Sequence, residues 1–149
     1  MSFRLAKESD LSTLVELLRQ LTKVERDFTF NAEKQRAGLQ RLINKSDAYV
    51  FVAEVGGLVA GMATIQELVS TVEGDVIGLI EDVVVHHNFR GKGVGRQLMD
   101  HLKATAEVKG YKRLQLLADV NNPPAEAFYE SQDFSPTSLK QWRWRPEAD

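Results

Sequence analysis

The stretch RGKGVG, residues 90–95, combines three glycines with two basic side chains just before an apolar helical pattern. Free backbone N–H groups and the dipole at a helix N-terminus attract anions. Gly91, Gly93 and Gly95 have no Cβ atom, so an anion could approach the main chain itself. The spacing matches neither a Walker P-loop nor a Rossmann fingerprint. It therefore predicts an anion site of another kind; the alternative is a tight turn that only caps the helix.

Two acids stand in the nearly apolar segment IGLIEDVVV, residues 77–85. Alternation along a strand predicts that Glu81 shares a face with Val83 and Val85, while Asp82 faces the other way. Glu81 is a candidate proton acceptor; the alternative is an ion pair or a splayed sheet edge. For Asp82, a salt bridge or solvent exposure is the simpler interpretation, with substrate contact as the alternative.

Metal and nucleic-acid chemistry have weaker support. His86 and His87 are adjacent and would diverge on a strand, and His101 has no acidic or histidine partner one helical turn later. We therefore expect no metal site and solvated histidines. WRWR, residues 142–145, combines aromatic and basic side chains as nucleic-acid binders do. Its period of two, together with a net charge of −2, instead favours a strand with tryptophans on the sheet and arginines in solvent or at a subunit contact.

Hydrophobic periodicity predicts the elements that position these groups. A period of two predicts strands at residues 3–5, 48–55, 58–69, 77–85, 113–119 and 139–146. Spacings of three and four predict helices that start near residue 11 after a Ser9 or Asp10 cap, span about 32–43, run from the glycine loop to Gly110, and follow Asn122. Gly56-Gly57 is a two-residue hairpin turn. The order predicts one α/β domain over residues 1–149, with a mixed, mostly antiparallel sheet flanked by helices.

Composition agrees with a globular domain. The chain has 149 residues, of which 43% are hydrophobic and 27% charged. The absence of cysteine excludes disulfides, thiolate metal sites and acyl transfer through an enzyme thiol. No run reaches the ~18 apolar residues of a membrane span, and the start lacks a signal-peptide core, so we expect a soluble, cytoplasmic protein.

The segment IEDVVVHHNFRGKGVG, residues 80–95, resembles the strand and loop of the GNAT superfamily of acetyl-CoA-dependent N-acetyltransferases. Arg90, Gly93 and Gly95 match the family signature [RQ]-x-x-G-x-[GA]. In that family the loop amides hold the pyrophosphate of coenzyme A. The predicted order of elements also fits the GNAT fold.

A second segment, NPPAEAFYESQDF at residues 122–134, resembles the family pattern N-x-x-A-x-x-F-Y-x-x-x-G-F. Two positions depart from the usual residues: Asp133 replaces the glycine before the last phenylalanine, and His87 stands where proline is frequent. Two motifs at a family-like separation extend the resemblance over nearly the whole chain.

The resemblance implies acetyl-CoA as cosubstrate, no metal, and direct transfer of the acetyl group to an amine. It implies that coenzyme A contacts Val83, Val84, Val85, Arg90, Gly91, Lys92, Gly93, Val94, Gly95, Arg96 and Asn122. It also matches Glu81 to a glutamate thought to accept the amine proton through a water. Tyr129 corresponds to the tyrosine that protonates the departing thiolate.

The acceptor is less well defined. IEDVVV and NPPAEAFYE are similar to segments of the polyamine acetyltransferases, and Glu25, Asp27 and Glu33, with Asp82, would suit a cationic amine. Basic residues interleave with these acids, as on a solvated face. Amino sugars, aminophosphonates and protein amines remain open as acceptors. The alternatives to a small-amine acetyltransferase are an acetyl-CoA sensor without turnover and a phosphate-loop nucleotide binder; a homodimer is expected only by analogy.

Overall fold

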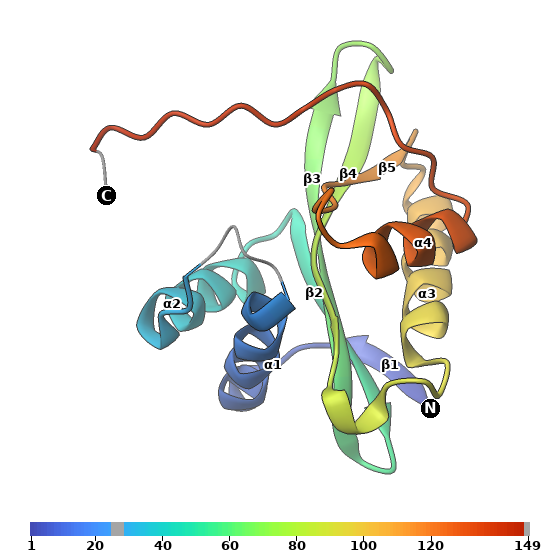
Figure 1. Cartoon of the computed structure of the whole chain (residues 1–149). Helices are drawn as coiled ribbons and strands as arrows, with labels where there is room; N and C mark the ends of the chain where they lie inside the picture. The colour runs from blue at the N-terminus through green and yellow to red at the C-terminus, as the bar shows by residue number, and fades with distance from the viewer. Residues whose placement is uncertain (25–28, 148–149) are drawn as a thin grey trace. The chain divides into compact units, whose positions relative to one another are not determined.

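The computed structural model describes residues 1–24 and 29–147, and contacts divide the chain into two compact units, Met1–Leu116 and Leu117–Asp149. The strands of the first unit are β1 (Ser2–Leu5), β2 (Ala48–Val55), β3 (Leu58–Ser70), β4 (Asp75–Val85) and β5 (Leu114–Leu116). Its helices are α1 (Leu11–Val24), α2 (Ala32–Ile43) and α3 (Val94–Lys109), with short 3-10 turns at Glu8–Asp10 and His87–Phe89. The second unit contains helix α4 (Pro123–Ser131) (Figure 1).

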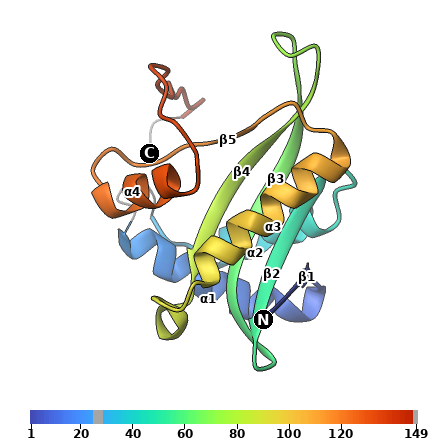
Figure 2. The ribbon, with the colours of Figure 1, turned by 90° about the vertical axis from the view of Figure 1, so that its right-hand side faces the viewer.

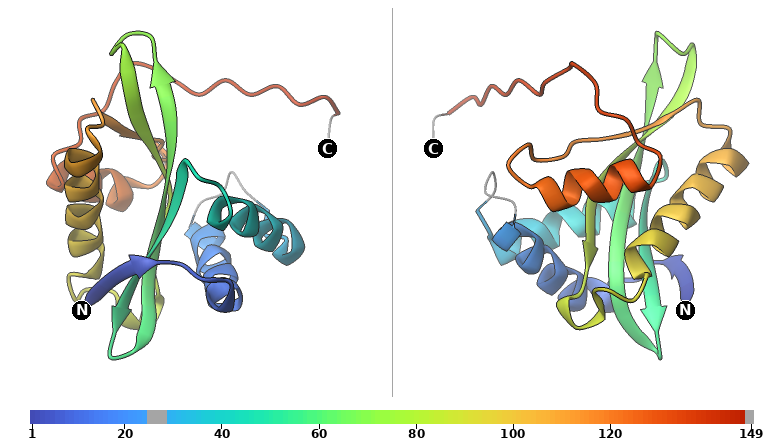
Figure 3. Two further views of the ribbon diagram at one scale, coloured as in Figure 1. Left: turned by 180° about the vertical axis from the view of Figure 1, so that it is seen from behind. Right: turned by 45° about the vertical axis from the view of Figure 1, so that its right-hand side comes forward.

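The strands of the first unit form one sheet in the order β1-β2-β3-β4-β5. Neighbouring strands are antiparallel except for β4 and β5, which are parallel because α3 connects them. Helices α1 and α2 cover one face of the sheet and α3 covers the other (Figures 2 and 3). The mixed, mostly antiparallel sheet between helices that the sequence predicts is confirmed. No helix in the described part of the chain is long and apolar enough to span a membrane.

The face below α1 and α2 is closed by a continuous apolar cluster. Leu14 and Leu17 of α1 and Leu39 of α2 pack with Val52 of β2 and Met62 of β3, and all five side chains are buried. Each of these apolar side chains gains about 1.5–3 kcal/mol from leaving water. The helix that the apolar spacing predicts at α1 is confirmed. Its apolar side chains lie on one face of the helix and pack against the inward-facing residues of the strands.

On the opposite face, α3 lies close to the centre of the sheet. A Cβ atom at Gly61 would lie 3.0 Å from the carbonyl oxygen of Val84 and 3.5 Å from Cγ1 of Val94. Glycine is thus required at this point of β3 for the helix start to pack against the strands. Leu98 and Leu102 continue the contact along α3 and are fully buried.

Local turn and capping signals predict several boundaries correctly. Gly56 and Gly57 have φ values of 58° and 78°, as a two-residue turn between β2 and β3 requires. Helix α2 spans Ala32–Ile43, as its periodicity predicts; the sequence analysis did not identify its N-cap Asn31, which accepts a hydrogen bond from the N–H of Lys34 at 3.2 Å. Gly110, with φ 73°, ends α3.

The predicted cap of α1 is wrong. Asp10 ends the 3-10 turn before the helix, and its carboxylate accepts from the N–H of Lys7 at 2.7 Å. The same carboxylate accepts two hydrogen bonds from Arg4, at 2.7 and 2.9 Å, and Arg4 also pairs with Glu54 at 2.6 Å. These contacts, led by the hydrogen bonds from Arg4, lower the pKa of Asp10. Arg4 therefore links β1 to the turn before α1 through Asp10 and to β2 through Glu54.

In the second unit, α4 begins as the sequence predicts. Asn122 is its N-cap and accepts from the N–H of Ala125 at 3.3 Å, with proline in the first turn. The last strand, expected at residues 139–146, is not formed: residues 135–147 contain neither helix nor strand. The strand expected at 113–119 is limited to Leu114–Leu116. An alternating pattern forms a strand only where a partner pairs with its backbone, and periodicity does not identify that partner.

Candidate active site

A β-bulge in β4 controls where its two acids lie. Thr64 of β3 pairs with Glu81, but Met62 pairs with Val84, so one residue of β3 faces two residues of β4 between these pairs. Asp82 lies in the bulge with φ 54°, a left-handed conformation that is uncommon outside glycine. Thr64 also donates a side-chain hydrogen bond to the carbonyl oxygen of Glu81 at 2.9 Å.

The bulge overturns the expected alternation. Thr64 and Met62 lie on the same face of β3, so their partners Glu81 and Val84 also share a face. Glu81 therefore does not share its face with Val83 and Val85, as strict alternation predicted. The shared face is the one that α1 and α2 cover, because Met62 and Val84 belong to the apolar cluster below these helices.

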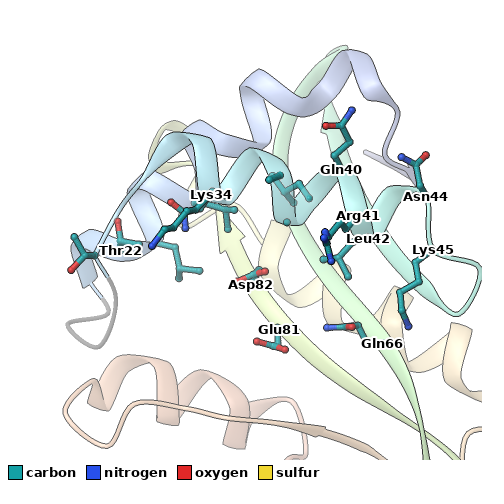
Figure 4. A pocket seen from close by; sticks show the side chains of 17 residues that line it. Thr22, Lys34, Gln40, Arg41, Leu42, Asn44, Lys45, Gln66, Glu81 and Asp82 are labelled. Carbon is teal, nitrogen blue, oxygen red and sulfur yellow. The ribbon is translucent and has the colours of Figure 1, made fainter. Parts of the chain in front are cut away.

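Both acids line one pocket of about 1100 Å³, so the expectation that Asp82 faces away from Glu81 is also wrong. Figure 4 shows the two carboxylates side by side on β4, below helix α2. The remaining lining residues come from α1, α2, the segments that flank α2, and β3: Leu18, Leu21, Thr22, Thr29, Lys34, Gln35, Ala37, Gly38, Leu39, Gln40, Arg41, Leu42, Asn44, Lys45 and Gln66. The volume slightly exceeds the range of about 300–1,000 Å³ that is typical of small-molecule sites.

The sequence analysis missed the basic part of this pocket. Lys34 and Arg41 project from α2 and Lys45 follows it, whereas the interleaved charges of this region suggested a solvated face. A spacing of seven residues places Lys34 and Arg41 on one helix face, and this signal was available in the sequence. The proposed acceptor contacts Glu25 and Asp27 lie outside the described residues.

The residues that follow Glu81 form an open strand edge. β5 pairs only with Gly78, Leu79 and Ile80 of β4. Among the described residues of the first unit, no strand pairs with Val83, Val84 or Val85 on that side. An extended ligand with amide groups could add to this edge as a further strand.

The glycine loop continues from this edge to the N-terminus of α3. Gly91 and Gly93 have φ values of 74° and 81°, and Gly93 is the N-cap of the helix. A Cβ atom at Gly91 would meet nothing within 4 Å, so the glycine is required by the left-handed backbone and the space above it is open. The first N–H groups of a helix have no partner within it. The loop therefore combines free N–H groups at a helix N-terminus with a main chain that a ligand can approach. These are the two features from which the sequence predicts an anion site.

The basic side chains of the loop have partners in the structure. Arg90 Nε donates to the carbonyl oxygen of Val85 at 3.2 Å, and Lys92 Nζ lies 5.6 Å from the centre of the Phe89 ring. Both residues are exposed, as is Arg96. The side chain of Val94 is buried, so only its main chain could contact a ligand.

A hydrogen bond replaces the proline that is frequent before such a loop. The N–H of His87 donates to the side-chain oxygen of the buried Gln20 at 3.0 Å, which ties the end of β4 to α1. Proline could not make this bond, since it has no N–H.

His87 is exposed, as the sequence predicts, but two other predictions for the histidines are wrong. His86 and His87 do not diverge; their rings stack with centroids 4.4 Å apart, because His86 lies past the end of β4 at the start of a 3-10 turn. His101 stacks on Phe3 at 5.0 Å and meets Phe51 edge-on at 5.2 Å. Burial lowers the pKa of His101, so it is a packed aromatic rather than a solvated side chain.

In the second unit, the turn after α4 fixes the surroundings of Tyr129. The carbonyl oxygen of Tyr129 accepts from the N–H of Phe134 at 3.0 Å, and their rings meet edge-on at 6.3 Å. Asp133 takes the left-handed conformation, with φ 69°, that glycine usually supplies at the end of a helix. The replacement of glycine by aspartate therefore keeps the geometry of the turn.

Comparison with known proteins agrees with this architecture. The model of the Acetyltransferase (GNAT) family matches residues 15–134. A glucosamine 6-phosphate N-acetyltransferase of Trypanosoma brucei brucei is 31% identical over 140 residues, which are 90% of this chain and 88% of the relative. An uncharacterized N-acetyltransferase of Bacillus subtilis is 26% identical over 134 residues, 90% of this chain and 89% of the relative. The structure of glucosamine-6-phosphate N-acetyltransferase from Arabidopsis thaliana has a TM-score of 0.76 at 25% identity and covers 96% of this chain and 97% of that one.

The chain belongs to the GNAT acetyltransferase family, since the family match covers most of its length. It is an acetyltransferase enzyme, and membership of the family implies acetyl-CoA as its cosubstrate.

Proposed function

We propose that the protein transfers the acetyl group of acetyl-CoA directly to a primary amine of a small molecule bound in the pocket at Glu81 and Asp82. The observation that carries this proposal is the pair of carboxylates lining a pocket of about 1100 Å³ at the start of the open edge of β4. The pocket suits a metabolite-sized acceptor.

Coenzyme A would bind along the edge of β4 and over the glycine loop. The main chain of Val83, Val84 and Val85 would pair with its amide-containing arm. The amides of Gly91 to Arg96 would hold its pyrophosphate at the N-terminus of α3, and Asn122 would contact the arm. The exposed loop backbone and the open strand edge support this assignment. The cosubstrate supplies the acetyl group as a thioester.

Glu81 would accept the proton that the amine must lose. An alkylammonium has a pKa of about 10.4, so presenting the neutral amine at pH 7 costs about 4.6 kcal/mol. A carboxylate beside the amine, acting directly or through a water, lowers this cost. Asp82, held in the same pocket by the bulge, would orient the ammonium group before it is deprotonated.

Tyr129 would return a proton to the thiolate of coenzyme A when the carbon–sulfur bond breaks. Positioned proton transfer of this kind contributes ~10²–10⁴-fold to the rate. The half-buried position of Tyr129 in α4, in contact with Phe128 and Phe134, supports a defined orientation of its ring. The family match runs from residue 15 to residue 134 and so includes residues of both units.

The acceptor class is tested by the release of coenzyme A in the presence of amino sugars and their phosphates, aminophosphonates, polyamines, amino acids and N-terminal peptides. A thiol-reactive dye detects only coenzyme A, because the chain has no cysteine. Turnover with one small-amine class supports the proposal. Turnover with peptides alone, or no turnover while acetyl-CoA still binds, would refute it.

We further propose a homodimer formed through the C-terminal segment. Trp142 and Trp144 are 92% and 84% exposed, although their period of two suits one face of a strand. Exposed apolar side chains in such a row mark an interaction surface. Sedimentation equilibrium should give a dimer for the native chain and a monomer for the variant Trp142→Ser with Trp144→Ser; a monomeric native chain would refute the proposal.

A further inference from the structure

Helix α2 presents a basic groove to the pocket. Lys34, Gly38 and Arg41 all line the pocket, and their spacing of four and three residues places them on one face of the helix. Figure 4 shows the side chains of Lys34 and Arg41 on α2. The strand β4 contributes Glu81 and Asp82 to the same pocket. The site thus has cationic groups on its helical side and carboxylates on its strand side.

The glycine between the two cations is not required by the fold. Gly38 lies within α2 with an ordinary helical backbone, and a Cβ atom there would meet nothing within 4 Å. Glycine lowers helix stability relative to almost any other residue. Its one structural effect at this position is to leave the surface between Lys34 and Arg41 bare, which lets a ligand approach the helix.

The two cations are available to a ligand. Within residues 1–24 and 29–147, neither Lys34 nor Arg41 has an ion-pair partner, whereas Lys45 pairs with Asp47 at 2.5 Å. Guanidinium groups bind phosphate and carboxylate oxygens through two parallel hydrogen bonds. A polyamine would be repelled by the same groups.

We infer that the acceptor is a primary amine that also carries an anionic group, and that Lys34 and Arg41 bind this group above Gly38 while the amine lies at Glu81 and Asp82. The anion can be a phosphate, a phosphonate or a carboxylate. This inference rests on the proposed function, because it names the class of acceptor for that site.

The first experiment compares acceptors that differ only in the anion. Coenzyme A release is measured with glucosamine 6-phosphate against glucosamine, 2-aminoethylphosphonate against propylamine, and β-alanine against propylamine, with spermidine as the polycation. We expect kcat/KM to be at least tenfold higher for the anionic member of one pair than for its neutral partner. The pair with the larger ratio identifies the anion. Equal values in every pair, or a preference for spermidine, would overturn the inference.

Variants of α2 test the groove itself. Arg41→Gln should raise KM for the preferred anionic acceptor at least tenfold. Arg36→Gln, an exposed arginine of the same helix that does not line the pocket, is the matched control and should leave this KM unchanged. Gly38→Gln should raise the melting temperature and also raise KM for the anionic acceptor at least tenfold. Unchanged KM values in Arg41→Gln and Gly38→Gln would overturn the inference.

A binding measurement separates this inference from the proposed function. Calorimetry with glucose 6-phosphate and glucose, in saturating coenzyme A so that the loop is filled, probes the groove without an amine. Binding of glucose 6-phosphate that Arg41→Gln weakens at least tenfold, and Arg36→Gln does not, supports the anion site even if no amine is acetylated. Acetylation of amines without preference, and without such binding, would overturn the inference and leave the proposed function standing.

Discussion

Helices α3 and α4 end in the same hydrogen-bonded turn, but with different residues at its left-handed position. The position is Gly110 after α3, with φ 73°, and Asp133 after α4, with φ 69°. In each turn, the N–H of the next residue donates to the carbonyl five residues earlier, at 2.9 Å and 3.0 Å respectively. We therefore predict that glycine, aspartate and alanine give the same order of stability at both positions, with glycine highest and alanine lowest.

The expected magnitudes follow from backbone strain alone. A Cβ atom at Gly110 would meet nothing within 4 Å, so no steric clash adds to the effect. The left-handed conformation costs a residue with a side chain about 1–2 kcal/mol, with aspartate below alanine because it can hydrogen-bond locally. Glycine loses about 0.5–1 kcal/mol more chain entropy on folding, which offsets part of this gain. Asp133→Gly should therefore stabilise the protein by about 0.5 kcal/mol, and Gly110→Ala should destabilise it by about 1 kcal/mol.

Urea unfolding followed by circular dichroism gives these differences from the shift in midpoint at constant slope. Gly110→Asp and Asp133→Ala complete the series. Asp133→Gly should leave coenzyme A release within twofold of the native rate, because the turn next to Tyr129 keeps its hydrogen bonds. A loss of stability in Asp133→Gly, or equal stability of glycine and alanine at Gly110, would refute the reasoning.

Three further predictions concern catalysis and pH. Glu81→Gln should lower kcat by ~10²-fold or more at pH 7 with little change in acetyl-CoA affinity; steady-state rates that stay within threefold would exclude it as the base. Tyr129→Phe should lower kcat by a similar factor, and its role as the acid is excluded if single-turnover rates are unchanged. Arg4 holds the pKa of Asp10 below its usual value. The stability that Asp10 contributes is therefore complete above the unfolded pKa of about 3.9 and is lost as pH falls through the folded pKa. Asp10→Asn should lower the free energy of unfolding at pH 7 and flatten its pH dependence below pH 4, which thermal melts from pH 7 to 3 would measure; an unchanged profile would contradict this.

The bulge in β4 explains why both acids of this strand line the same pocket. Glu81, which pairs with Thr64, lies on the face below α1 and α2, and the bulge that follows places Asp82 in the same pocket with a left-handed backbone. A regular strand would have sent the two acids to opposite faces.

The sequence by itself determined the elements whose signals are local. The spacing of apolar residues predicts α2, Gly110 predicts the end of α3, and Asn122 predicts the start of α4. Gly56-Gly57 predicts the hairpin between β2 and β3. These signals act between residues a few positions apart, so a single sequence carries them. The glycine loop was predicted for the same reason.

Only the tertiary structure decided what depends on partners distant in the chain. The pairing of β4 with β3 decides which face of the sheet each side chain after Glu81 takes. Alternation along one strand could therefore not reveal the bulge. The pocket joins residues of α2 to acids of β4 that lie about forty positions later, and the pattern of charges on α2 does not identify this neighbour. The alternating tail beyond Phe134 has the pattern of a strand but lacks one, because backbone hydrogen bonds in a sheet require a second strand that the local pattern does not supply.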